Sequence, residues 1–284
     1  MVGGDGLRCG RAVRGKNGPV TTEYSASGDP KRSIELLWGA PERPKRGPKP
    51  RLSVKRIAEA AIGIADREGL AALSMRRVAE EVGVTAMSLY TYVPSKAELI
   101  DVMLDTVLGE LPLDEDETDD GQPGGGAGGW RAKLERAAGR NRDIYLRHPW
   151  LLQVATGRPV LGPNLIAKYD HELRAVDGIG LTDVEMDLIV SLLGDYVHGA
   201  VRSQIEAAQI RQRTGMTDEQ WWARWAPLLE KVFDPERFPV AARVGAAAGA
   251  QYNAPADPAR SFEFGLARVL DGIEAFIAAR QRSA

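Results

Sequence analysis

The chain of 284 residues contains few of the residues that form covalent cross-links or metal centres. Its one cysteine, Cys9, excludes an intrachain disulfide and a cysteine-based zinc site, and fits a reducing compartment. The three histidines lie far apart in the sequence, and neither a His-x-x-x-His pair nor a nucleophile motif occurs. The glycines between Gly124 and Gly129 follow no strand, so they do not form a phosphate-binding loop. We therefore predict no metal site and no catalytic residues.

Long apolar runs are also absent. No segment approaches the roughly 18 apolar residues that a membrane-spanning helix needs. The first twenty residues lack the apolar region of a secretory signal. The hydrophobic content of 44% is still enough for a full core, and the length favours two domains of unequal size. We expect a soluble cytoplasmic protein with no membrane partner.

The net charge of -2 is unevenly distributed. Residues 1–110 contain 17 Lys and Arg against 14 Asp and Glu, whereas the remainder contains 20 against 25. Seven basic residues fall within residues 41–60, where only Glu42 and Glu59 oppose them: Arg43, Lys45, Arg46, Lys49, Arg51, Lys55 and Arg56. Such a run is most often a solvated linker. Next to a DNA-binding motif, however, it could neutralise several phosphates and add salt-dependent affinity.

Four short helices are predicted between residues 51 and 111, the third running to about Tyr92. Each follows a hydroxyl residue that can cap its N-terminus: Ser53, Ser74, Thr85 and Ser95. Gly69 and Gly83 end the first two helices, and Ser95 with Glu98 forms a capping box for the fourth. The tight turn at Gly83 joins the second and third helices into a helix-turn-helix.

The remaining segments divide the chain further. Residues 1–50 are predicted to be a mostly disordered extension, with a possible short helix at 30–38 and a basic arm at 43–51. The acidic and then glycine-rich residues 112–129 are predicted to be a flexible linker. No strand alternation appears after it, and helices are expected at about 130–147, from 149, and at 163–176, 183–211, 218–233 and 258–280. Thr182 with Glu185, and Thr217 with Gln220, are capping boxes at two of these starts. The fold class is therefore all-α.

The segment from Ser74 to Lys96, with its flanks, resembles the DNA-binding domain of the TetR (tetracycline-repressor-like) family of transcriptional regulators. The matching motifs are Ala65-Asp-Arg-Glu-Gly69, Ser74-Met-Arg-Arg-Val-Ala79, Gly83-Val-Thr85, Ser88-Leu-Tyr-Thr-Tyr-Val93 and Ser95-Lys-Ala-Glu-Leu99. More weakly, the segments at 148–151 and 264–273 look like the ligand-binding half of the tetracycline-repressor-type branch. The resemblance implies a homeodomain-like helix-turn-helix domain at 51–111 and a larger all-helical effector-binding and dimerisation domain at 130–284.

The resemblance also implies which residues contact DNA. Ala86 and Met87 would lead the third helix into the major groove, where their apolar side chains suit thymine methyl groups rather than hydrogen-bonded readout. The other expected contacts, to phosphates or base edges, are Arg76, Thr85, Ser88, Tyr90, Tyr92 and Lys96. For Tyr90, packing against the first helix is the alternative. Leu89 and Val93 are expected in the core.

The basic arm is similar to an AT-hook, a short extended strip that lies in an A/T-rich minor groove. In Pro44-Lys-Arg46-Gly-Pro48-Lys-Pro-Arg51, the prolines keep the backbone extended, and a narrow minor groove attracts arginine. Arg46, Lys49 and Arg51 are therefore added to the predicted DNA contacts.

Two helices of the larger domain have apolar faces that could join two subunits. The last helix has apolar residues at spacings of four and three, which are typical of lengthwise helix packing. The helix from Asp183 is apolar on more than one face. The predicted dimer interface comprises Leu188, Leu192, Tyr196, Gly199, Phe262, Leu266, Val269, Ile273 and Phe276. An ordinary buried helix is the alternative.

Aromatic residues and methionine in the larger domain suit an apolar ligand held by a few polar anchors. The predicted effector-binding residues are Trp150, Tyr169, His171, Met186, Tyr196, His198, Trp221, Trp222 and Trp225. Each of them taken singly is more often a core residue. No cofactor is predicted, although an effector chelated to magnesium stays open.

These patterns predict a homodimeric, ligand-responsive transcriptional regulator. We expect a repressor that a small apolar or amphipathic effector releases from a palindromic operator, with half-sites about one DNA turn apart. The alternatives are an activator, and an all-helical enzyme or protein-interaction module with a DNA-binding head. The sequence identifies neither the effector nor the operator, and leaves the role of residues 1–42 open.

Overall fold

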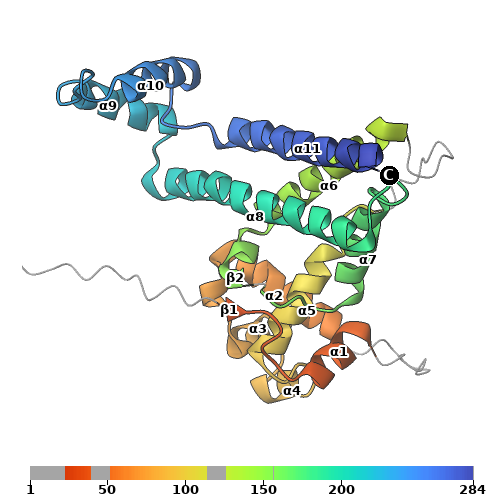
Figure 1. The fold of residues 1–284 in the computed structure, drawn as a ribbon. Helices are drawn as coiled ribbons and strands as arrows, with labels where there is room; N and C mark the ends of the chain where they lie inside the picture. The colour runs from red at the N-terminus through yellow and green to blue at the C-terminus, as the bar shows by residue number, and fades with distance from the viewer. Residues whose placement is uncertain (1–22, 40–51, 114–125, 156, 284) are drawn as a thin grey trace, which may run out of the picture.

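The computed structural model describes residues 23–39, 52–113, 126–155 and 157–283, and is built from helices (Figure 1). Two short strands, β1 (Glu23–Tyr24) and β2 (Val154–Ala155), pair in parallel. The all-α expectation is confirmed. The basic arm at 43–51, the first 22 residues and most of the predicted linker lie outside the described residues. Within those described, no helix is long and apolar enough to cross a membrane.

The helix-turn-helix forms where the caps predict it. Helices α2 (Val54–Glu68), α3 (Met75–Val82), α4 (Ala86–Tyr90) and α5 (Lys96–Leu108) begin after the four predicted hydroxyl residues, each of which accepts a backbone N–H bond. Gly83 is left-handed, with φ of 75°, so the sharp turn needs glycine. Helix α4 ends at Tyr90 rather than Tyr92, because Thr91 closes it and Pro94 lies three residues further on.

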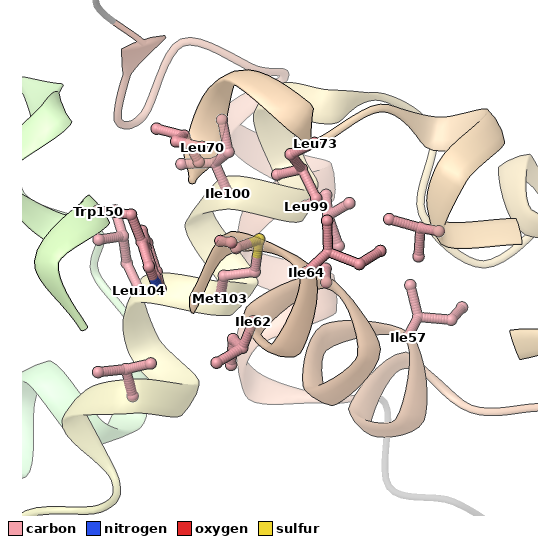
Figure 2. Close-up of a cluster of buried hydrophobic side chains, with 14 of the residues drawn as sticks. Ile57, Ile62, Ile64, Leu70, Leu73, Leu99, Ile100, Met103, Leu104 and Trp150 are labelled. Carbon is pink, nitrogen blue, oxygen red and sulfur yellow. The ribbon is translucent and has the colours of Figure 1, made fainter. Parts of the chain in front are cut away.

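One core holds the DNA-binding half together. Ile57, Ile64, Leu99 and Met103 are buried between α2 and α5, as Figure 2 shows. Trp150 enters the same core from the short 3₁₀ helix at Pro149–Gln153, which follows α6 (Gly126–Arg147). The DNA-binding half is therefore completed by a side chain from the larger half.

The N-terminal extension is more ordered than its composition predicts. The helix expected at 30–38 is confirmed as α1 (Pro30–Trp38), with Asp29 as its cap and Pro30 at its first position. Residues 23–26, which we expected to be disordered, instead form β1 and its continuation against β2. The partner strand lies about 130 residues away, so local composition contained no sign of it.

The larger half is a helical bundle. Helix α8 (Asp183–Thr214) packs against α6 and α11 (Pro258–Ser283), with α7 (Pro163–Arg174) beside it (Figure 1). Both predicted capping boxes, at Thr182 and Thr217, are confirmed. Helix α6 begins at Gly126, so the end of the predicted linker is helical.

Helices α9 (Asp218–Leu229) and α10 (Pro239–Tyr252) form an arm at one end of this bundle (Figure 1). We did not predict α10. Its run of alanine, glycine and valine has no apolar periodicity, and Pro239 at its first position was the only start signal. None of the residues in these two helices is buried, and their apolar side chains include Trp225 on α9 and Val244 on α10, exposed by 54% and 50%.

Candidate DNA interface and effector domain

Helix α4 is a short rod with one buried and one exposed side. Thr85 accepts a hydrogen bond from the Ser88 backbone N–H, and the two hydroxyls lie 2.9 Å apart. Leu89 is fully buried, as expected, and Ala86 is half-buried against the same core. Met87 is 76% exposed. Of the two residues predicted to lead the helix, Met87 is therefore the one whose side chain is free to enter a groove.

Two tyrosines lie beside this exposed side. Tyr90 is 46% exposed and Tyr92 is 38% exposed, whereas Val93 is buried as predicted. The exposure of Tyr90 argues against the alternative of close packing on the first helix. Tyr90 is the last residue of α4 and Tyr92 follows it by two residues, so both exposed phenol rings lie at the end of this helix.

Two neighbouring arginines on α3 differ in their surroundings. The Arg76 side chain is 87% exposed and makes one surface ion pair, with Glu80 at 3.0 Å. Arg77 pairs with both Glu68 and Glu81, and its hydrogen bond to Glu68 raises its pKa. A solvated ion pair is weak, so Arg76 can exchange its partner for a phosphate with little loss.

Lys96 is engaged within the chain. Its Nζ lies 2.7 Å from Oε1 of Glu23 on β1, and the two side chains are only 31% and 29% exposed. Its predicted phosphate contact therefore has an internal carboxylate as competitor. Sequence reasoning missed this pair because 73 residues separate the two side chains. The bonds at Ser95 and Glu98 differ from the predicted capping box: Ser95 accepts the Ala97 N–H, and Glu98 accepts the Ser95 hydroxyl and the Asp29 N–H of the extension.

The two halves of the chain meet at a polar cluster around the buried His148. His148 is 4% exposed, with its Nδ1 2.8 Å from Asp66 on α2 and its Nε2 3.2 Å from Glu110 after α5. The indole N–H of Trp150 donates to the same Asp66 oxygen at 2.8 Å. Trp150 is therefore a junction residue, buried in the DNA-binding core and apart from the other predicted effector residues. Burial acts to raise the pKa of Glu110, but hydrogen bonds from His148 and Arg147 outweigh it and lower that pKa.

Two buried carboxylates on α5 tie this helix to other parts of the chain. Asp105 accepts bonds from the backbone N–H groups of Asn164 and Leu165, which lie in the first turn of α7. Asp101 accepts bonds from the Ala26 N–H and the Ser33 hydroxyl. Burial raises the pKa of both carboxyls. Asp101 and Asp105 lie one turn apart on α5, so the helix contacts the N-terminal extension and the start of α7 at successive turns. Two aspartates within an apolar helix were the signal in the sequence.

The structure separates the other predicted effector residues into two groups. The first lies on α7 and α8: the Tyr169 hydroxyl donates to Asp187, Tyr196 donates to the Phe262 carbonyl, and Met186 packs on the bundle core. The ring of His171 lies 2.9 Å from Arg140. His198 meets Tyr145 edge-on at 5.5 Å, and burial lowers the pKa of its imidazole.

The second group is the tryptophan cluster on α9. Trp221 and Trp225 stack with ring centroids 5.3 Å apart, and the rings of Trp221 and Trp222 stack at 6.4 Å. Trp222 also lines a cavity of about 250 Å³ between α9 and α10, together with Ala226 and Phe233. This cluster belongs to the arm, so the nine predicted residues do not form one pocket.

The predicted dimer interface is also divided. Leu188, Leu192 and Phe276 are 60%, 49% and 42% exposed, Gly199 is exposed, and Val269 and Tyr196 are half-buried. Phe262, Leu266 and Ile273 are instead buried in the core of their own chain. These three are covered within one subunit and leave the predicted interface. Spacing along a helix cannot tell a face that packs within its own chain from a face that could pack against a second subunit.

Comparisons with known proteins follow the same division of the chain. Residues 57–103 match the family model of "Bacterial regulatory proteins, tetR family", and residues 122–277 match that of the "Tetracyclin repressor-like, C-terminal domain". The chain is 45% identical over 264 residues to the HTH-type transcriptional repressor DrrR1 of Streptomyces coeruleorubidus, covering 92% of both chains. It is 31% identical over 168 residues to an HTH-type transcriptional regulator of Saccharopolyspora erythraea, covering 59% of this chain and 67% of that one.

Among solved structures, apo ActR from Streptomyces coelicolor is similar, with a TM-score of 0.64 and 28% identity over 84% of this chain and all of that one. ActR in complex with actinorhodin gives a TM-score of 0.62 at 28% identity, covering 80% of this chain and 98% of that one. ActR has also been solved in complex with (S)-DNPA.

Proposed function

The chain belongs to the TetR family of bacterial regulatory proteins, and we propose that it is a homodimeric repressor which a small amphipathic molecule releases from a near-palindromic operator. The observation that carries this proposal is α4, a capped helix whose Met87 projects into solvent between hydroxyl-bearing neighbours. The match to the repressor DrrR1 over 92% of both chains supports repression over activation. We further propose that it acts in the cytoplasm, associated with the nucleoid when bound to its operator.

The proposed DNA contacts follow from the exposed side of the helix-turn-helix. Met87 would contact thymine methyl groups in the major groove, and the hydroxyls of Tyr90 and Tyr92 would donate to phosphates. Arg76 would exchange Glu80 for a phosphate. The phosphate contacts would fix the position of the protein along the DNA, but these side chains form few hydrogen bonds to base edges. Operator recognition would therefore depend on several weak contacts in each half-site.

The proposed dimer interface is the exposed apolar seam of α8 and α11. Leu188, Leu192 and Phe276 are large apolar side chains that one chain leaves in solvent, and Gly199 on α8 permits close approach of a second helix. Pairing two such seams about a two-fold axis would place two α4 helices for neighbouring major grooves on one side of the DNA.

The proposed effector site lies among α6, α7 and α8. Here His198, Tyr145 and His171 supply polar atoms beside the apolar bundle core, the combination that ligand pockets use. ActR complexes with actinorhodin and (S)-DNPA support a small-molecule effector. Contacts of Asp105 with α7 would pass a displacement of that helix to α5 and so to α4. We propose no enzymatic role.

Selection of DNA by the full chain tests the proposal. The duplexes recovered from a random library are expected to contain an inverted repeat, with half-site centres about 10 base pairs apart or a multiple of that spacing. Light scattering at micromolar concentration is expected to give a dimer. A variant with Leu188→Lys and Leu192→Lys is expected to be monomeric and to bind the selected duplex at least tenfold more weakly, because like charges would face each other across the seam.

Val240→Lys with Val244→Lys is the matched control, since it adds the same charge at two exposed apolar positions with the same spacing on α10, outside the proposed interface. A wild-type monomer, or selected sites without symmetry, would contradict the dimer model.

The basic arm gives a separate prediction. Replacing Arg46 and Arg51 by alanine is expected to weaken binding to the selected duplex and to reduce the slope of log K against log salt by roughly 0.9 for each lost phosphate contact. Fluorescence anisotropy between 0.05 and 0.3 M salt, roughly the range over which such slopes are resolved, measures both. Replacing Arg8 and Arg11 in the same extension is the charge-matched control. An unchanged slope would rule out the minor-groove arm.

A further inference from the structure

The N-terminal extension joins the effector domain to the DNA-binding half by a route separate from the chain connection. At one end, β1 pairs with β2, so that Glu23 lies beside Val154 and Tyr24 beside Ala155. The buried Ser25 donates its hydroxyl to the carbonyls of Ala155 and Arg158 at 3.1 and 2.7 Å. These carbonyls belong to the segment that leads from the 3₁₀ helix to α7. Val154 packs in the DNA-binding core, and Arg158 lies five residues before the start of α7, so the start of the extension follows a segment that lies between the two halves.

A few residues later the extension is fixed to α5. Asp101 accepts the Ala26 N–H at 2.8 Å and the Ser33 hydroxyl at 3.1 Å, and Glu98 accepts the Asp29 N–H at 3.1 Å. Gly28 lies so close to Glu98 that a Cβ there would be 2.6 Å from its Oε1. Close packing of this kind leaves little slack between β1 and α5.

The ion pair of Glu23 with Lys96 lies between these two attachments. Lys96 is the first residue of α5, only four residues after Tyr92, and an ammonium at this position would reach a phosphate of DNA bound by α4. Glu23 lies at 2.7 Å and already binds that ammonium. A carboxylate and a phosphate are both anionic oxygen acceptors, so the two compete for the same N–H donors.

We propose that Glu23 is an internal competitor for the DNA phosphate at Lys96, and that its position on β1 makes the strength of this competition depend on the effector domain. The inference rests on the proposed operator binding. It adds Glu23 as a residue that sets the affinity for DNA, and it adds a route by which the effector domain controls that affinity. Displacing the 154–158 segment away from α5 would withdraw Glu23 and release Lys96, whereas the opposite movement would hold the pair closed.

The test uses the full chain and a duplex selected by the wild-type protein. Glu23→Gln is expected to tighten binding by about two- to fivefold near 0.1 M salt, the range that breaking one partly exposed ion pair corresponds to. The slope of log K against log salt is expected to become steeper by up to about 0.9, because Lys96 gains one phosphate contact. Glu35→Gln is the matched control, since Glu35 lies on α1 of the same extension and pairs only loosely with Lys31, at 3.9 Å.

Two further variants separate competition from a general change in charge. In a Lys96→Gln background, Glu23→Gln is expected to change affinity no more than Glu35→Gln does, because the competed donor is gone. Ser25→Ala removes the bonds to the 154–158 segment and is expected to act in the same direction as Glu23→Gln. Ser27→Ala, which removes only an exposed bond to the Tyr24 carbonyl, is its control and is expected to leave affinity unchanged.

Each outcome decides a different claim. Equal effects of Glu23→Gln and Glu35→Gln, or weaker binding by Glu23→Gln, would overturn the competition. An equal gain in affinity from Glu23→Gln in the wild-type and Lys96→Gln backgrounds would also overturn it while leaving operator binding intact. Failure of the wild-type chain to select any duplex would instead overturn the proposed function and the inference with it.

Discussion

Replacing Met87 by glutamate is expected to lower affinity for the selected duplex by at least about a hundredfold, or roughly 3 kcal/mol. Met87 is 76% exposed on α4, and it lies in the turn that would enter the major groove first. A carboxylate there would face base edges and phosphates in a region of strongly negative potential. Because the position is exposed, the substitution is not expected to change the free energy of unfolding by more than about 0.5 kcal/mol.

Met87→Leu is the conservative control, since it keeps an apolar side chain of similar volume. It is expected to bind within about threefold of the wild type, because contact with a thymine methyl group needs only apolar surface. Anisotropy titrations measure the affinities, and circular dichroism checks that both variants keep their helical content. Binding by Met87→Glu within tenfold of the wild type would mean that α4 does not read the major groove with this face.

Replacing Trp150 by alanine is expected to give the largest loss of stability, about 3–5 kcal/mol in the free energy of unfolding. The indole is 1% exposed and fills the DNA-binding core beside Leu104 (Figure 2). Its N–H donates to Asp66, which is also bonded to His148. Without the indole, Asp66 would retain only the bond with His148. Because Trp150 comes from the larger half, its removal is also expected to loosen the attachment between the two halves.

Two variants bracket this result in urea unfolding at one fixed protein concentration, since dimerisation makes stability depend on concentration. Trp150→Phe keeps most of the ring volume and is expected to lose about 1–2 kcal/mol, chiefly through the missing hydrogen bond to Asp66. Trp225→Ala removes an indole that is 54% exposed on α9 and is expected to cost less than about 1 kcal/mol. Equal losses for Trp150→Ala and Trp225→Ala would show that Trp150 has no special role at the junction.

The reading helix could be located from the sequence because its boundaries are local. Thr85 accepts the Ser88 N–H, and Gly83 supplies the left-handed turn, so the helix-turn-helix depends on residues within a few positions of one another. The same holds for the capping boxes at Thr182 and Thr217. Helix α10 was not predicted because its alanine-rich sequence lacks the apolar periodicity that indicates an amphipathic helix.

The effector domain was harder to interpret because aromatic residues serve three separate environments there. Trp150 belongs to the junction, Tyr196 bonds the α11 backbone, and Trp221 stacks on the exposed arm. The sequence shows an aromatic residue in each of these three environments, so residue type alone could not tell them apart. The interface residues failed in a related way, since Phe262 and Phe276 share one periodic pattern although the first is buried in its own chain and the second is exposed.

The sequence by itself determined the helix-turn-helix, its caps and its exposed reading residues, because helix propensity, capping and turn chemistry act within a few residues of the chain. The tertiary structure alone decided that Trp150 completes the DNA-binding core, that Asp105 holds α7, and that Glu23 binds Lys96. Those contacts join residues that are 60 positions apart for Asp105 and Leu165, 73 for Glu23 and Lys96, and 84 for Asp66 and Trp150. Their formation depends on how packed helices and one short strand pair bring distant side chains together, and no local pattern encodes that arrangement.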